Sequence, residues 1–124
     1  MQSQRTASVT ASQTAVTTAW LAGDDFRVGC ARLRLTRVEC STGSVTHLRA
    51  GFRLKDADGT VVYENTMDVV KWIEHPNDII EVGVEAGSGT GVRPHRMLTP
   101  EFMADAAGRT VTAVIHFEPI GAKN

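Results

Sequence analysis

Residues 46–72 read THLRAGFRLKDADGTVVYENTMDVVKW and predict a long β-hairpin. In the first arm, 46–55, apolar and polar residues alternate, which is typical of a strand with one buried and one exposed face. The next four residues, Asp56-Ala57-Asp58-Gly59, predict a turn, because glycine tolerates positive φ and aspartate bonds nearby backbone. The return arm runs to residue 70, so each arm has about ten residues, twice the usual strand length.

Two registers of this hairpin compete. A three-residue loop pairs Asp56 with Thr60 and sets Phe52 opposite Glu64. A two- or four-residue loop pairs Lys55 with Thr60 and sets Phe52 opposite Tyr63. Because a slip of one residue moves the whole apolar set to the other face, burial favours the second register. That register has these further consequences: Leu54 opposite Val61, Leu48 opposite Met67, His47 opposite Asp68, and Arg49 diagonal to Glu64 and Asp68.

The rest of the chain predicts more strands and one helix. Apolar alternation indicates strands at 26–40, 80–86 and 109–118, and in the first of these the apolar face changes near Cys30 and Ala31, which indicates a β-bulge. Thr99 as N-cap, Pro100 as first helical residue and Gly108 as the residue after the helix predict one short helix.

These elements define the fold class. They predict an all-β protein: an antiparallel β-sandwich or small barrel of about six strands, with one short helix near the C-terminus. The 124 residues are expected to form one domain, with residues 1–19 as an extended N-terminal arm and 20–124 as the β domain. The N-terminus lacks a secretory pattern and no apolar run suits a membrane span, so we expect a cytoplasmic chain or one assembled in a particle.

Charge is unevenly distributed along the chain. Residues 26–55 hold seven bases and one acid, whereas residues 56–85 hold eight acids and one base. Either adjacent strands neutralise one another, or a basic surface meets the acidic surface of a neighbouring subunit. On the second interpretation the candidate interface residues are Arg32, Arg34, Arg49, Arg53, Glu64 and Asp68. The net charge of −1 disfavours nucleic acid as a partner.

Few residues suggest chemistry. The four histidines and two cysteines never fall at a zinc-ligand spacing, so we predict no metal, no cofactor and no catalytic residue. Cys30 and Cys40 would lie about 30 Å apart on one strand, too far for a disulfide. One candidate ligand loop covers residues 87–96, where glycines precede basic residues; its candidate residues are Ser88, Thr90, Arg93, His95 and Arg96.

Three functions are compatible with these features. The first is a non-enzymatic structural subunit that assembles with copies of itself, such as a capsid, decoration or tail component of a virus or phage. The second is a β-sandwich module that binds a small ligand or peptide through the loop 87–96. The third is a small enzyme whose site is assembled from residues distant in sequence.

Overall fold

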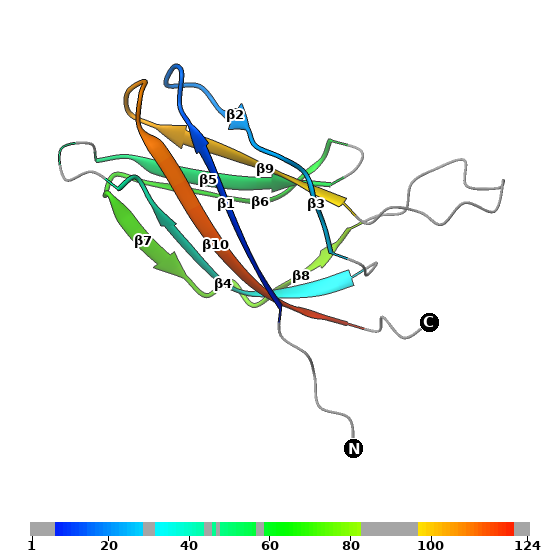
Figure 1. The fold of residues 1–124 in the computed structure, drawn as a ribbon. Coiled ribbons are helices and arrows are strands. Elements are labelled where there is room, and N and C mark those ends of the chain that lie inside the picture. The colour runs from blue at the N-terminus through cyan, green and yellow to red at the C-terminus, as the bar shows by residue number, and fades with distance from the viewer. Residues whose placement is uncertain are drawn as a thin grey trace, which may run out of the picture.

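The computed structural model describes residues 7–28, 32–43, 46, 48–56, 59–82 and 97–120. These residues form ten β-strands and no helix (Figure 1). The strands are β1 (Ala7–Thr14), β2 (Leu21–Ala22), β3 (Phe26–Arg27), β4 (Arg32–Ser41), β5 (Ala50–Lys55), β6 (Val61–Met67), β7 (Lys71–Glu74), β8 (Asp78–Glu81), β9 (Met97–Ala104) and β10 (Thr110–Pro119).

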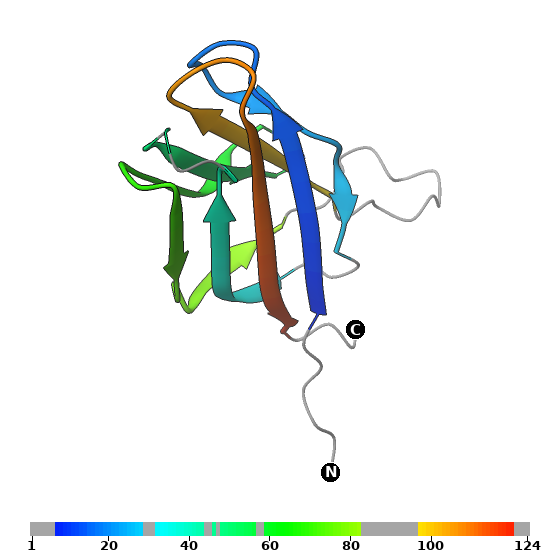
Figure 2. The same ribbon diagram turned by 60° about the vertical axis from the view of Figure 1, so that its left-hand side comes forward.

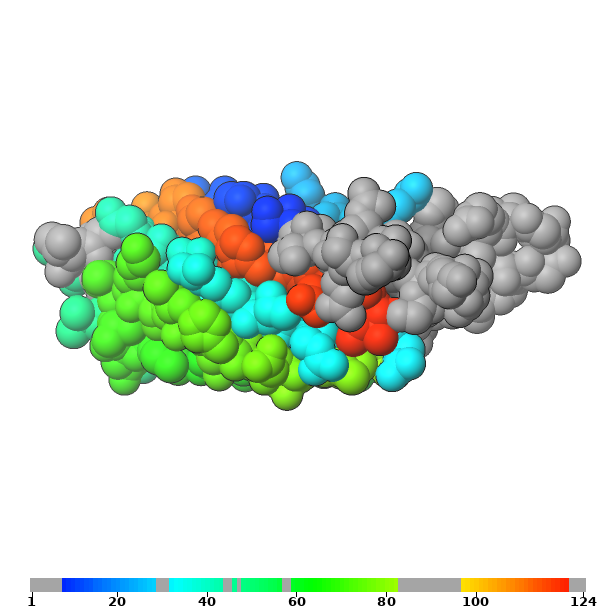
Figure 3. Space-filling view, turned by 90° about the horizontal axis from the view of Figure 1, so that it is seen from below, coloured from blue at the N-terminus to red at the C-terminus, as the bar shows by residue number. Residues whose placement is uncertain are grey.

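The strands form two antiparallel sheets that pack face to face. Sheet A has the order β1-β10-β4-β7, with β8 also paired to β4, and Figure 2 shows its strands side by side. Sheet B has the order β2-β9-β5-β6, with β3 also paired to β9. Figure 3 views sheet A from outside, with β7 and β8 in green, then β4, β10 and β1. Because β7 and β8 follow one another along β4, and β2 and β3 along β9, each sheet is four strands wide.

The connectivity is that of a jelly roll. If β2/β3 and β7/β8 each count as one interrupted strand, sheet A takes the first, eighth, third and sixth strands along the chain. Sheet B takes the second, seventh, fourth and fifth, which gives the double-sheet jelly-roll order. The predicted sandwich is therefore confirmed, while the small barrel and the count of about six strands are wrong.

The predicted helix at 99–108 is also wrong. Residues 97–104 form β9, in which Leu98, Pro100, Phe102 and Ala104 are buried in strict alternation. Burial of this face outweighs the N-cap and proline signals, because each large apolar side chain contributes about 1.5–3 kcal/mol and a cap about 1 kcal/mol.

Pro100 is tolerated in an inner strand because the neighbouring edge is interrupted between β2 and β3. The carbonyl of Pro100 accepts a hydrogen bond from the N–H of Gly23 at 2.8 Å. In an antiparallel strand, the backbone N and the carbonyl O of one residue point to the same side. The nitrogen of Pro100 therefore faces the gap between β2 and β3, where no ladder bond is lost. Gly108 does adopt positive φ, at 88°, but in the turn between β9 and β10.

The central hairpin combines features of both registers. The N–H of Asp56 donates to the carbonyl of Thr60 at 2.9 Å and Gly59 has φ 85°, as the three-residue loop requires. A bulge beyond Lys55 then shifts the ladder, so that Phe52 lies opposite Asn65. The side chains of Phe52, Leu54 and Tyr63 do face the core, as the second register predicted. The pairs predicted across the ladder are wrong: Leu54 faces Tyr63, Ala50 faces Met67, and Leu48 lies outside the ladder. The predicted pairing of His47 with Asp68 involves a residue outside the described part.

The two arms are shorter than predicted. β5 has six residues and β6 has seven, because the chain bends at residues 68–70 and enters sheet A as β7. Trp72 on β7 then points into the core, and its indole Nε1 donates to the carbonyl of Ala50 in sheet B at 2.5 Å. The second arm of the predicted hairpin therefore joins the two sheets.

A β-bulge in β4 changes which residues face the core. The buried residues shift from Leu33 and Leu35 to Val38 and Cys40, and the pairing with β10 shifts at the same place. The hydroxyl of Thr36, at the bulge, donates to the carbonyl of His116 at 3.0 Å. The bulge predicted near Cys30 and Ala31 falls on residues outside the described part, and the observed one lies further along the strand.

The core is centred on aromatic side chains of sheet B. The ring of Phe52 lies 5.3 Å from that of Phe102 and 6.3 Å from that of Tyr63, centroid to centroid. Side chains predicted to be buried on the last strand do face this core, namely Val111, Ala113, Ile115 and Phe117. The hydroxyl of Tyr63 donates to Glu74 of sheet A, so polar and apolar contacts both connect the sheets.

We predict that Trp72→Phe lowers the free energy of unfolding by about 1–3 kcal/mol, because it removes the donor to the buried Ala50 carbonyl. Urea unfolding followed by circular dichroism measures the change. Ile73→Thr is the matched control, since Ile73 is 43% exposed and should change stability by less than about 0.5 kcal/mol. Equal stability of both variants would contradict the role of the indole bond.

Candidate functional site

A cluster of charged residues covers the outer face of sheet B. Arg53 on β5 contacts Glu101 on β9, with 2.5 Å between Nε and Oε1. Lys55 contacts the other oxygen of Glu101 at 3.2 Å, and Arg53 lies 3.5 Å from Glu64 on β6. We call these four residues the Arg53 cluster. Its two bases and two acids neutralise one another across three strands.

Trp20 lies over this cluster. The guanidinium carbon of Arg53 is 4.5 Å from the centre of the indole, which is the geometry of a cation–π contact. A Cβ atom at Gly51 would come within 3.2 Å of both Trp20 and Met103, so glycine permits the close approach. The loop between β1 and β2, which carries Trp20, is therefore anchored on sheet B.

The environment of Glu101 favours its charged form. Burial alone raises the pKa of this carboxyl, but the hydrogen bonds from Arg53 and Lys55 outweigh burial and hold the pKa below its ordinary value of 4.5. The side chain is only 12% exposed, so solvent screens these contacts weakly. The cluster thus has the character of a structural ion network.

The basic residues of β4 meet acidic or carbonyl partners on their own sheet. Arg32 contacts Glu81 on β8 at 3.0 Å, and Arg34 donates to the carbonyl of Asn77 at 3.2 Å. At the loop after β6, Arg49 contacts Asp68 at 3.0 Å, as the hairpin geometry predicted. The pair of Arg32 with Glu81 neutralises charge between the neighbouring strands β4 and β8, as the first of the two interpretations of the charge pattern expects.

A second small cluster lies on the outer face of sheet A. Arg37 contacts Glu39 at 3.2 Å along β4. Nε2 of His116 on β10 lies 3.4 Å from the same carboxylate but without hydrogen-bond geometry. The cluster holds one acid, so it resembles a surface ion pair more than an acid–base site.

The six candidate interface residues do not share one surface. Arg32 and Arg34 lie on sheet A, Arg53 and Glu64 lie on the outer face of sheet B, and the pair of Arg49 and Asp68 lies between strands of the hairpin region. Their role in contacts between subunits remains a prediction. The candidate ligand loop, with Ser88, Thr90, Arg93, His95 and Arg96, lies outside the described residues.

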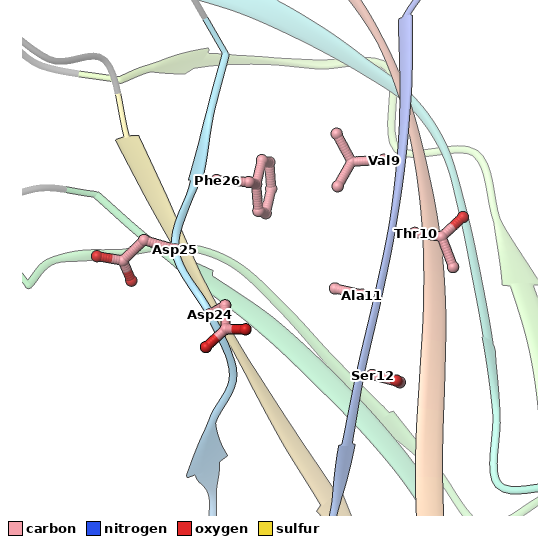
Figure 4. Close-up of a pocket in the computed structure, with 7 residues that line it drawn as sticks. All are labelled: Val9, Thr10, Ala11, Ser12, Asp24, Asp25 and Phe26. Atoms are coloured by element: carbon pink, nitrogen blue, oxygen red, sulfur yellow. The ribbon is translucent and has the colours of Figure 1, made fainter.

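A cleft of about 330 Å³ lies between β1 and the β2/β3 edge (Figure 4). The side chains of Val9, Ala11 and Phe26 form its apolar part, and Figure 4 shows Phe26 and Val9 pointing toward one another. Asp24 and Asp25 lie at its rim, where a carboxylate oxygen of Asp25 accepts a hydrogen bond from Thr99 at 2.7 Å. The cleft is the open flank of the sandwich, because it separates an edge of sheet A from an edge of sheet B.

The sequence reasoning did not identify this cleft. Val9 and Ala11 alternate with polar residues in the predicted arm, and that period of two could have indicated a paired strand. Phe26 belongs to a two-residue strand that carries no pattern of its own. Only the strand order brings these residues together.

The described residues include no group of three or more histidine, cysteine, aspartate or glutamate side chains that could hold a metal ion. Cys40 is a free, buried thiol, and burial raises its pKa to about 12, which disfavours the thiolate a nucleophile needs. In the same part of the chain, no helix is long and apolar enough to cross a membrane.

We predict that Glu101→Gln lowers the free energy of unfolding by about 1–3 kcal/mol at pH 7. Because the folded-state pKa of Glu101 is below 4.5, its stabilisation is complete above that pH and is lost as the pH falls through the folded-state pKa. The difference between the variant and the native chain should therefore shrink toward pH 3. Urea unfolding at several pH values measures it.

Glu64→Gln is the control for this experiment, since the Glu64 side chain is 47% exposed and lies farther from Arg53. It should cost less than about 0.5 kcal/mol at either pH. A penalty for Glu101→Gln that does not depend on pH would contradict the ion network.

Comparisons with known proteins show the fold. No family model and no curated protein matches the sequence. A chain of infectious bursal disease virus, Gx strain, is similar with a TM-score of 0.52 and 12% identity, over 99% of this chain and 34% of that chain. A chain of the Gt strain is similar with a TM-score of 0.50 and 14% identity, over 97% and 33%. The SPBc2 prophage-derived protein YomS matches over 94% and 96%, with a TM-score of 0.45 and 13% identity. The chain thus spans about a third of the virus chains' length, and at these identities the likeness shows the fold alone.

Proposed function

We propose that the chain is a structural subunit of an assembly built from copies of itself, such as a component of a virus or phage particle. The observation that carries this proposal is the jelly-roll order of the two sheets. A chain of a virus has a similar fold over 99% of this chain. Double-sheet jelly rolls occur in viral capsid domains, among other proteins.

The structure suits a rigid building block. Two sheets are tied together by the Phe52 core, by the indole bond of Trp72 and by the contact of Tyr63 with Glu74. Outside the core, the Arg53 cluster fixes a loop on sheet B. A subunit held in this way can present its surfaces in a constant geometry.

One end of the sandwich offers an apolar contact surface. The described residues of the loops 15–20, 42–49 (42, 43, 46, 48 and 49), 68–70 and 105–109 lie together at this end, at the upper left of Figure 1. Hydrogen bonds connect three of them: the N–H of Leu48 donates to a carboxylate oxygen of Asp105 at 3.1 Å, and that of Thr42 donates to the carbonyl of Val70 at 2.8 Å. We call the described residues of these four segments the loop end.

The loop end exposes apolar side chains from three of its four segments. Val16 is 65% exposed, Leu48 59% and Val69 41%. Exposed apolar groups that gather on one part of a surface are typical of contacts between proteins. We infer that the loop end contacts a neighbouring copy in the assembly.

The charged candidates can contribute to such contacts as well. The side chains of Arg32 and Glu81 are 46% and 70% exposed, and exposed pairs stabilise a monomer by about 0–1 kcal/mol. Either partner could therefore exchange its contact for one to a neighbouring subunit at small cost. The same argument applies to the pair of Arg49 and Asp68, whose side chains are 47% and 76% exposed.

Light scattering after size exclusion, together with negative-stain electron microscopy, tests the proposal. At high micromolar concentration we expect a mass of several monomers and particles of regular shape. Leu48→Lys should lower the assembled mass, because it places a charge on the apolar loop end. Val61→Lys is the control, since Val61 is 41% exposed but begins β6 at the opposite end of that strand.

A chain that remains monomeric at every concentration up to high micromolar would contradict the proposed function. An assembly that forms equally well in the Leu48→Lys variant would contradict the role of the loop end while leaving the function in place.

A further inference from the structure

In the part of the chain that the structure describes, the two sheets have four edges, and three of these are interrupted. The β2/β3 edge is broken between Ala22 and Phe26, and the β7/β8 edge at Pro76 and Asn77, where Asn77 has φ 55°. The β6 edge contains the bulge opposite Lys55. Bulges, prolines and charges are the devices by which proteins keep an edge strand from pairing with another chain.

The fourth edge, β1, has none of these devices. Its eight residues, ASVTASQT, pair with β10 in an unbroken register from Ala7 to Thr14. The strand contains no charge and no proline, and within the described part of the chain no strand pairs with its other side. It is thus a regular, neutral strand with one free edge.

The hydrogen bonds reveal which residues face this free edge. The N–H of Ala15 donates to the carbonyl of Arg109 at 2.9 Å, so the odd-numbered residues of β1 bond to β10. The even-numbered residues consequently direct their N–H and C=O outward. At one end of the strand, the N–H of Thr14 already donates to the side-chain oxygen of Gln13 at 3.0 Å. The residues that remain to pair with a further strand are therefore Ser8, Thr10 and Ser12.

These three residues form a self-complementary set. In an antiparallel pair of two β1 strands with Thr10 on the two-fold axis, Thr10 faces Thr10 of the partner subunit and Ser8 faces Ser12 of the partner subunit. Every outward N–H then meets an outward C=O, as an antiparallel ladder requires. Thr10 side chains meet on the outer face, and threonine pairs across strands are favourable.

The cleft beside β1 suits the same arrangement. A partner strand at this edge would direct its odd-numbered side chains inward, toward the apolar part formed by Val9, Ala11 and Phe26. The small apolar residues it brings there are Val9 and Ala11 of the partner subunit. Because β1 is neutral, no like charges face one another across the strand pair.

We propose that β1 is a contact between two copies of this chain, which pair antiparallel about Thr10 and join their A sheets into one continuous sheet. This inference rests on the proposed function, since it names one of the surfaces by which the subunits assemble. It is distinct from the loop end, so the two surfaces can act in the same particle.

Cysteine cross-linking tests the register, in full-length chains that carry Cys30→Ser and retain the buried Cys40. Thr10→Cys should form a covalent dimer under air oxidation, because facing Cα atoms in a bonded pair are about 5.5 Å apart, within disulfide range. Ser8→Cys should not cross-link to itself, since the two copies of residue 8 lie about 13 Å apart at the usual strand rise. A mixture of Ser8→Cys with Ser12→Cys should cross-link.

Thr10→Pro provides a second measurement. It removes an outward N–H but no bond to β10, so circular dichroism should remain native while association through β1 falls at least tenfold in light scattering. Thr10→Val, which keeps the backbone N–H, is the matched control and should associate normally.

The proposal is overturned if Thr10→Cys gives no covalent dimer, or if Thr10→Pro associates as the native chain does. In either case assembly of the native chain through another surface would leave the proposed function standing. A native chain that never associates would overturn both.

Discussion

Phe52 lies between Phe102 and Tyr63 on the inner face of sheet B, and the rest of the structure depends on the burial of that face. Sheet A covers it with the inward side chains of β4 and β10, and Trp72 reaches across to bond the Ala50 carbonyl. Each large apolar side chain contributes about 1.5–3 kcal/mol when it is buried. No single cap, turn or surface ion pair is of that size.

The β-bulges are consequences of this constraint. In β4 the bulge at Thr36 allows both Leu35 and Val38 to face the core although their spacing is odd. In the central hairpin, the bulge beyond Lys55 satisfies the three-residue turn and the burial of Tyr63 together. The edge strands β2/β3 and β7/β8 are interrupted without a bulge, and in each case two short strands pair with one long neighbour.

The sequence pattern was sufficient to predict which side chains of a strand face the core. It was not sufficient to predict which residues of two paired strands lie opposite one another. Strict alternation predicted the buried sides of β5 and β10 correctly, because the period of two is local. The two predicted registers differed by one residue, whereas the bulge joins the three-residue turn to a third register, in which Phe52 faces Asn65. The helix prediction at 99–108 failed because Thr99, Pro100 and Gly108 gave strong local signals while the alternation from Leu98 to Ala104 was overlooked.

The functional surfaces were less predictable than the fold. The contact of Arg49 with Asp68 follows from the hairpin alone, but the contact of Arg53 with Glu101 required β9 to be a strand. The cleft beside β1 depends on a strand order that places residues 9–12 beside residues 24–26. The strand order decides which distant segments of the chain become neighbours. Neither the alternation of apolar residues nor the composition of the sequence encodes that order.

In the proposed assembly, the neutral, uninterrupted β1 edge is covered by β1 of a second copy. Amide hydrogen exchange of Thr10 and Ser12, measured by nuclear magnetic resonance across a range of protein concentrations, tests this most directly. The amide of Thr14 serves as the internal reference, since Gln13 already accepts its bond. The account predicts that protection of Thr10 and Ser12 rises with concentration while that of Thr14 stays constant. Exchange at Thr10 and Ser12 that is fast at every concentration would contradict it.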